Sequence, residues 1–259
     1  MKTNRLNKLF DNKKDLLSIY YTAGYPKLDD TTIVLKALEK AGVDFVEIGM
    51  PYSDPLADGP VIQNSGTVAL KNGMSLKVLL KQLEGVRDYV KMPIVLMGYI
   101  NPIMRFGFEE FLKKCSEVGI DGLIIPDLPF ELYEEKYKTL FEKYNISNIF
   151  LITPQTPEDR VILLDNGSTS FIYMVANAAV TGAKTGLSQF QLDYFNRIKN
   201  MNLKTPCMVG FGISNNETYS AVCKYSHGAI IGSAFVNVIG QSNDLEKDIN
   251  SYIESVLNK

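Results

Sequence analysis

Eight short apolar segments recur along the chain, separated by longer segments with a helical period, and this alternation limits the fold more than any other feature. The apolar segments are nearly continuous rather than alternating with polar residues, which is typical of parallel strands covered by helices. The predicted strands are Leu17–Thr22, Phe45–Gly49, Ile94–Tyr99, Gly122–Pro126, Ile149–Thr153, Phe171–Ala176, Met208–Gly212 and Ala229–Ile231. The predicted helices include Thr31–Ala41, Leu76–Val90, Glu109–Val118, Leu132–Tyr144 and Asn216–Lys224.

Eight strand-then-helix units in a chain of 259 residues leave about 32 residues for each unit. This spacing favours an α/β fold of the closed (β/α)8 type, the TIM barrel, over an open doubly wound sheet. Because no linker or low-complexity segment divides the chain, we predict one domain over residues 1–259, with extra short helices that include one after the eighth strand. Two helix starts have the pattern of a capping box, Ser188 with Gln191 and Ser214 with Glu217.

Charge and residue usage exclude several classes of protein. The chain has 27 Lys and Arg against 29 Asp and Glu, so nothing suggests binding to nucleic acid or to an anionic membrane. One histidine and three scattered cysteines form no metal-site spacing, so we expect no metal. The longest apolar run, Phe171–Val180, is about half of a membrane span, and Met1–Lys14 lacks the apolar stretch of a secretory signal. We therefore expect a cytoplasmic protein.

The second predicted strand carries an acidic residue in an apolar setting. In such a barrel, functional groups gather at the carboxyl ends of the strands and in the loops that follow. Because side chains alternate along a strand, Glu47 should point into the barrel while Val46 and Ile48 face the helices. Burial there raises the pKa of a carboxyl group towards neutrality, which suits a general acid and base. A structural glutamate paired with a neighbour fits the same pattern.

The loop after this strand, Pro51–Pro60, holds two acids, Asp54 and Asp58, among prolines that restrict the backbone. Such a loop can hold a carboxylate near a site. A simple turn explains the Asp-Pro and Asp-Gly dipeptides equally well. Asp58 lies far enough beyond the strand to fold back over the opening of the barrel, so the loop pattern leaves both interpretations open.

The last two predicted strands end in glycine-containing segments, Gly210–Ser214 and Gly232–Phe235, and each segment leads into a helical pattern. Barrels of this type often bind a phosphate at this place, between backbone N–H groups and the N-terminus of a short helix. We therefore predict a ligand that is a phosphomonoester. The alternative is a pair of ordinary tight turns.

The sixth predicted strand places Tyr173 on the face that Phe171 and Val175 share. From this position the phenol ring either fills the core or reaches the opening of the barrel. The segment that follows, Thr181–Gly186, has the glycine and threonine content of a mobile lid, and a surface loop has the same composition. Pattern alone does not separate these interpretations.

The run Glu47–Pro60 reads Glu-Ile-Gly-Met-Pro-Tyr-Ser-Asp-Pro-Leu-Ala-Asp-Gly-Pro and resembles the signature of tryptophan synthase alpha subunits. The resemblance implies a (β/α)8 barrel lyase of tryptophan biosynthesis, which cleaves indole-3-glycerol phosphate to indole and glyceraldehyde 3-phosphate by a retro-aldol reaction. Two alternatives are another phosphosugar barrel enzyme, such as an isomerase or epimerase, and a non-catalytic regulatory partner of the beta subunit. The similarity covers essentially the whole chain and includes Asn101-Pro102, Pro126–Pro129, Val180–Gly182, Gly210–Ser214 and Gly232-Ser233.

By this resemblance the catalytic residues are Glu47, Asp58 and Tyr173. Glu47 would protonate indole C3 and then remove the proton of the adjacent hydroxyl, because one group of near-neutral pKa can do both in turn. Asp58 would accept the indole N–H and stabilise the positive charge that develops on that nitrogen. The resemblance implies substrate binding by Tyr99, Thr181, Gly182, Phe211, Gly212, Gly232 and Ser233.

The resemblance also implies a protein partner. Members of the family work with a beta subunit that holds pyridoxal phosphate, in an α2β2 heterotetramer, so this chain is expected to need no cofactor of its own. The expected contacts with that subunit are Pro51, Asp54, Asn101 and Pro102. The stretch Ala176–Ala179 departs from the serine and glycine of many members, which bears on closure of the lid.

Overall fold

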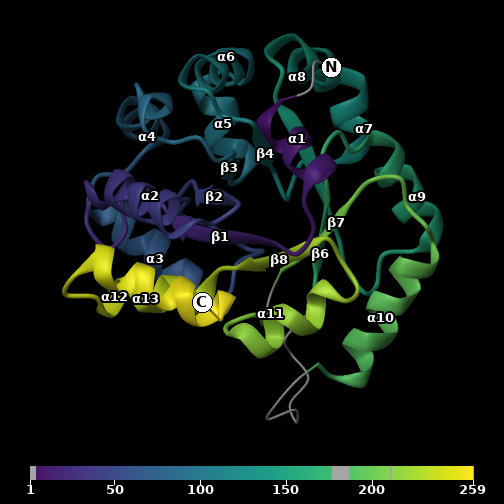
Figure 1. Cartoon of the computed structure of the whole chain (residues 1–259). Helices are drawn as coiled ribbons and strands as arrows, with labels where there is room; N and C mark the ends of the chain where they lie inside the picture. The colour runs from purple at the N-terminus through teal and green to yellow at the C-terminus, as the bar shows by residue number, and fades with distance from the viewer. Residues whose placement is uncertain (1–3, 177–186, 211, 259) are drawn as a thin grey trace.

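The eight strands of the computed structural model form a closed parallel barrel in chain order, with the eighth strand paired to the first. Figure 1 shows the strands in the centre with the helices around them. The structure describes residues 4–176, 187–210 and 212–258. The predicted (β/α)8 fold is therefore confirmed. The strands are β1 (Leu16–Thr22), β2 (Phe45–Gly49), β3 (Ile94–Met97), β4 (Gly122–Ile124), β5 (Ser147–Ile152), β6 (Ile172–Val175), β7 (Cys207–Gly210) and β8 (Gly228–Ile231).

Apart from the N-terminal helix, which precedes the first strand, the helices follow the strands and pack on the outside of the barrel. Two of the predicted helices are divided. The segment predicted as one helix from Leu76 splits into an α-helix and a 3-10 helix, and the segment from Leu132 contains a π-helix. The helical elements are α1 (Arg5–Asn12), α2 (Asp30–Ala41), α3 (Pro60–Lys71), α4 (Leu76–Gln82), η1 (Val86–Asp88), α5 (Ile100–Phe106), α6 (Phe108–Val118), α7 (Phe130–Leu132), η2 (Tyr133–Tyr137), α8 (Lys138–Tyr144), α9 (Glu158–Gly167), α10 (Gln189–Asn200), α11 (Asn216–Cys223), α12 (Ser233–Gln241) and α13 (Leu245–Leu257).

Capping explains where two of these helices begin. The predicted capping box of Ser188 and Gln191 starts α10 and is confirmed. The box predicted for Ser214 and Glu217 is wrong by one residue, because Asn215 caps α11 and exchanges hydrogen bonds with Thr218. Asn is as good an N-cap as Ser, so composition alone does not choose between adjacent candidates.

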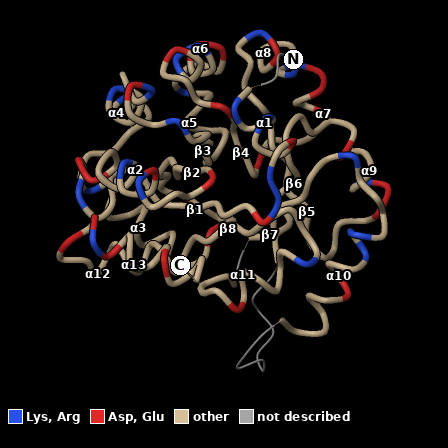
Figure 2. Tube along the Cα trace, viewed as in Figure 1, with Lys and Arg blue, Asp and Glu red and all other residues tan. Residues whose placement is uncertain are grey.

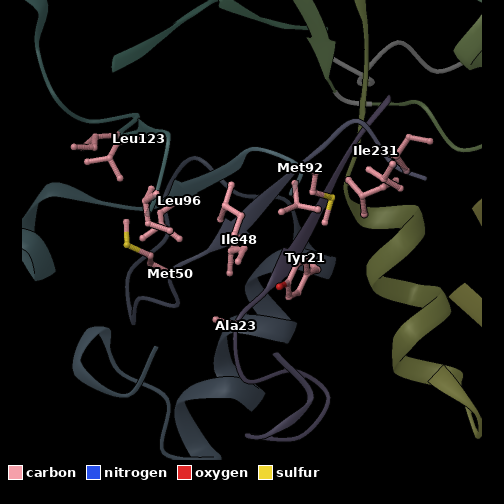
Figure 3. Packing of buried hydrophobic residues seen from close by; sticks show 14 of the residues in the cluster. Tyr21, Ala23, Ile48, Met50, Met92, Leu96, Leu123 and Ile231 are labelled. Carbon is pink, nitrogen blue, oxygen red and sulfur yellow. The ribbon is translucent and has the colours of Figure 1, made fainter. Parts of the chain in front are cut away.

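Strand alternation divides the buried residues into two layers. Val46 and Ile48 face outward and join the large cluster between strands and helices, in which Ile48, Leu96 and Leu123 lie together (Figure 3). Phe45 faces inward and belongs to a separate cluster inside the barrel, with residues such as Val95. Glu47 has the same parity as Phe45 and is fully buried, so the predicted inward orientation agrees with this layering.

An N-terminal helix closes the barrel at the amino ends of the strands. Leu6 of α1 is fully buried and packs with the interior cluster. The ring of Phe10 lies 5.4 Å from that of Phe171 and 6.2 Å from that of Phe45, measured between centroids. The interior is thus a packed core at this end of the barrel.

Charged residues of both signs are interspersed over the outer helices (Figure 2). Many form exposed pairs, such as Lys40 with Glu246 and Lys143 with Glu109. Within the described ranges, no helix is both long and apolar enough to cross a membrane.

One buried carboxylate ties the amino end of the barrel together. The side chain of Asp121 is 1% exposed. Its oxygens accept hydrogen bonds from Arg87 Nη2 at 2.6 Å, from Arg5 Nη1 at 2.9 Å and from the backbone N–H of Ile94 at 2.9 Å. Bonds from charged donors offset the cost of burying this charge.

Replacing Asp121 with Ala should lower the free energy of unfolding by roughly 3 kcal/mol, because the Ile94 N–H loses its acceptor and the partly buried Arg87 loses its carboxylate partner. Urea denaturation measures the change. Glu246→Ala, which removes an exposed pair with Lys40, is the control and should cost less than about 1 kcal/mol. Equal costs for the two variants would show that the Asp121 network does not stabilise the barrel.

Candidate active site

A cavity of about 510 Å³ lies at the carboxyl ends of the strands, where the fold places functional groups. It brings together five residues that the sequence predicted for the site, from β6 and from the loops after β2, β7 and β8. These five are Asp58, Tyr173, Gly212, Gly232 and Ser233. Tyr20, Gly59, Ile62, Met97, Ile213, Ser214, Ile230, Ala234 and Asn237 complete the lining.

Glu47 lies beside this cavity rather than on its wall. It is fully buried and is the register partner of Tyr20, which does line the cavity. Its Oε1 accepts a hydrogen bond of 3.2 Å from Ser18 Oγ, and Oε2 has no hydrogen-bond partner within the described residues. Burial raises the pKa of Glu47 to about 8, and the Ser18 bond opposes that rise. The carboxyl group therefore holds a proton at neutral pH.

Asp58 lies on the loop before α3 and is less buried than Glu47. Its Oδ2 accepts a hydrogen bond of 3.2 Å from the hydroxyl of Tyr99. Burial raises the pKa of Asp58 to about 6, and the Tyr99 bond lowers it. At pH 7 Asp58 is therefore mostly ionised, so the two acids beside one cavity differ in charge.

Tyr99, which the sequence predicted to bind substrate, contacts the Asp58 loop and is not among the described residues that line the cavity. Its hydroxyl accepts the backbone N–H of Ala57 at 2.9 Å while it donates to Asp58. Its ring packs on Tyr52 with a centroid distance of 5.4 Å, and Asn101 Nδ2 donates to the Tyr52 hydroxyl at 3.3 Å. The two tyrosines thus connect the Asp58 loop with the start of α5.

Two tyrosines inside the opening depend on glycines on the neighbouring strands. A Cβ atom at Gly49 would lie 2.1 Å from the Tyr20 hydroxyl oxygen, and one at Gly210 would lie 2.0 Å from that of Tyr173. Any larger residue at these two positions would displace the rings. Burial raises the pKa of both phenols, so both stay protonated.

Sequence reasoning missed Tyr20. The signal was present, since Tyr20 shares its strand face with Ser18 and is paired in register with Glu47. Register between two strands cannot be read from either strand alone, however, so the pairing of Tyr20 with Glu47 was not predictable from local pattern.

The far side of the cavity has the chemistry of an anion site. Gly232 and Ser233 lie at the start of α12, a helix of nine residues, and line the cavity together with Gly212. Free backbone N–H groups and the helix dipole attract negative charge at such a terminus. Among the described residues that line the cavity, none is Lys or Arg, so a phosphate here would be held by neutral donors.

Several predicted residues fall elsewhere. Thr181, Gly182 and Phe211, together with the stretch from Asn177 to Ala179, lie outside the described residues. Asp54 and Asn101 are exposed near this end of the barrel, while Pro51 and Pro102 are half-buried. In the described part of the chain, no group of three or more His, Cys, Asp or Glu could hold a metal ion.

Comparison with known proteins gives a consistent result. A family model described as tryptophan synthase alpha chain matches residues 6–258. The tryptophan synthase alpha chain of Bacteroides thetaiotaomicron is 55% identical over 247 residues, which cover 95% of this chain and 96% of that relative. That of Flavobacterium johnsoniae is 54% identical over 239 residues, covering 92% and 94%.

Solved structures of tryptophan synthase chains have the same fold as this chain at lower sequence identity. Tryptophan synthase subunit alpha from Legionella pneumophila has a TM-score of 0.89 at 30% identity, covering 99% of this chain and 98% of that chain. A chain of the tryptophan synthase complex from Pyrococcus furiosus has a TM-score of 0.86 at 32% identity, covering 95% and 99%. The match over nearly the full length shows that the chain belongs to the tryptophan synthase alpha chain family.

Proposed function

We propose that Glu47 and Asp58 are the two groups that carry out the reaction of this family. The chain is a carbon–carbon lyase that cleaves indole-3-glycerol phosphate to indole and glyceraldehyde 3-phosphate in tryptophan biosynthesis. The family assignment supports this activity and neither of the two alternatives, an isomerase or a non-catalytic partner. The observation that carries the proposed roles is the pair of acids with separated pKa values beside one cavity, near 8 for Glu47 and near 6 for Asp58.

Glu47 supplies protons in this proposal. Cleavage requires a proton at indole C3, so that the ring can accept the electrons of the breaking carbon–carbon bond. A carboxyl group that is neutral at pH 7 can donate that proton. The resulting carboxylate then removes the proton of the substrate hydroxyl as the aldehyde forms, which returns Glu47 to its starting state.

Asp58 acts on the other side of the indole. Because it is ionised at neutral pH, its carboxylate can accept the indole N–H and stabilise the charge that develops on that nitrogen. Tyr99 holds this carboxylate through its hydroxyl. Tyr173 lines the same cavity and orients the substrate, and Gly212, Gly232 and Ser233 bind its phosphate. Thr181, Gly182 and Phe211 complete the proposed binding residues.

We further propose that residues 1–259 act as one domain in the cytoplasm and assemble with a beta subunit as an α2β2 heterotetramer. The structural similarity to a chain of the Pyrococcus furiosus tryptophan synthase complex supports the assembly. Pyridoxal phosphate belongs to the beta subunit, and the alpha chain needs no cofactor of its own. The proposed contacts are Pro51, Asp54, Asn101 and Pro102, which lie near the end of the barrel that carries the cavity.

Glu47→Gln tests the proposed catalytic role. The amide has nearly the same shape but cannot transfer a proton, so kcat for indole release should fall roughly 10³-fold. Isothermal titration with glycerol 3-phosphate should give a Kd within about twofold of that of the unmodified chain, because the phosphate end of the cavity is untouched. Substantial indole production by this variant would rule Glu47 out as the proton donor.

The pH dependence of kcat/KM tests both acids together. The lower limb should lie near pH 6, since activity is lost as pH falls and Asp58 takes up a proton. The upper limb should lie near pH 8, since activity is lost as pH rises and Glu47 gives up the proton it must donate.

Tyr99→Phe should move only the lower limb of that profile. The variant loses the hydrogen bond that lowers the pKa of Asp58, so the limb should shift upward by roughly half to one pH unit. Tyr52→Phe is the matched control, because it removes a phenol hydroxyl from the same ring pair and leaves the Asp58 bond in place. A lower limb that stays still in Tyr99→Phe would show that this bond does not control Asp58.

Light scattering of the chain mixed with a pyridoxal-phosphate beta subunit tests the assembly. The mass should correspond to two copies of each chain, and Asp54→Ala should weaken association roughly tenfold. Glu246→Ala on α13 serves as the control and should associate normally. Failure of the unmodified chain to bind, or normal binding by Asp54→Ala, would contradict the proposed surface.

A further inference from the structure

Ser18 places a hydroxyl group in a part of the barrel that is otherwise apolar. It lies on β1, is fully buried and has the same strand parity as Leu16, which packs in the interior cluster with Phe45 and Val95. A buried hydroxyl among such side chains needs a polar partner. Its partner is Glu47 Oε1, at 3.2 Å.

Strand register explains why these two side chains meet. Ser18 pairs with Phe45, and Tyr20 pairs with Glu47, so the hydroxyl approaches the carboxyl group from the amino end of the barrel. The cavity lies at the other end and is lined by Tyr20 and Tyr173. Ser18 therefore contacts Glu47 from the side opposite to the substrate.

We propose that Ser18 is a positioning residue for the lyase reaction, whose hydroxyl holds Glu47 Oε1 and leaves the transferable proton on Oε2. This inference rests on the proposed role of Glu47. Ser18 itself touches no substrate atom and acts through the carboxyl group.

The chemistry follows from the direction of the hydrogen bond. A neutral carboxylic acid has one oxygen that carries the proton and one that is only an acceptor. The Ser18 hydroxyl has a single proton, and donating it makes Oε1 the acceptor oxygen. The acid proton is then on Oε2, the oxygen that has no partner within the described part of the chain.

In this arrangement a single oxygen, Oε2, gives up one proton and takes one back in each catalytic cycle. The Oε2–H bond breaks as the C3–H bond of the indole forms. The carbon–carbon bond then breaks as the substrate hydroxyl becomes the aldehyde carbonyl, and Oε2 takes the hydroxyl proton. No electrons are exchanged with any other group, and Ser18 keeps its own proton throughout.

The groups around Glu47 support the assignment of its acid proton to Oε2. The phenols of Tyr20 and Tyr173 interact electrostatically with Glu47, and burial keeps both phenols neutral. Neither supplies a charge that would fix the carboxyl group. The Ser18 bond also lowers the pKa of Glu47 below the value that burial alone would give. Removing the hydroxyl should therefore change both the orientation of the acid and its titration.

Ser18→Ala tests this inference through the pH profile. We expect kcat to fall roughly tenfold with KM within twofold, and the upper limb of kcat/KM to move upward by roughly half to one pH unit. A role in packing alone would leave that limb in place. Ser18→Thr keeps the hydroxyl and should restore the limb, and Ser18→Cys, close in size with a weak donor, replaces Ala if the smaller side chain prevents folding.

Ser147→Ala is the matched control, because it removes another fully buried hydroxyl from the barrel, on β5 and bonded to Asn4. It should leave the pH limb unchanged. An unmoved upper limb in Ser18→Ala and Ser18→Cys, with normal kcat, would overturn the role of Ser18 and leave the lyase proposal intact. Full activity of Glu47→Gln would instead overturn the proposed role of Glu47 itself.

Discussion

Burial of the Glu47 carboxyl group without a positive partner is the constraint on which the site depends. The same barrel buries Asp121 at its other end, where Arg5 and Arg87 contact the carboxylate. Glu47 has a serine hydroxyl in place of an arginine, so burial raises its pKa to about 8. Asp121 therefore holds strands together through its arginine partners, and Glu47 is kept as a proton donor.

The two ends of the barrel divide stability from chemistry. At the amino ends, α1 and the Asp121 network close the interior with aromatic packing and charged hydrogen bonds. Toward the carboxyl ends, Tyr20 and Tyr173 line a cavity, and glycines on adjacent strands make room for their rings. This division is general for the fold, since loops at the carboxyl ends can change without disturbing the core.

The sequence was enough to predict those features that depend on the local periodicity of apolar residues, such as which face of a strand is buried. Alternation along β2 was enough to orient Glu47, because its apolar neighbours Val46 and Ile48 require the outer face. The π-helix at Tyr133–Tyr137 was not predicted, and the cap of α11 was placed one residue too early, because Ser214 and Asn215 are equally good N-cap residues. The bonds of Ser18 to Glu47 and of Tyr99 to Asp58 join residues 29 and 41 positions apart. They depend on register and on loop conformation, which no local pattern contains.

The most direct measurement is an infrared pH titration of the protonated carboxyl stretch, taken as the difference between the unmodified chain and Glu47→Gln. We expect a band from Glu47 at pH 7 that disappears with a midpoint near pH 8. A carboxyl group that is already ionised at pH 7, with a midpoint near the ordinary glutamate value of about 4.3, would contradict a buried proton donor.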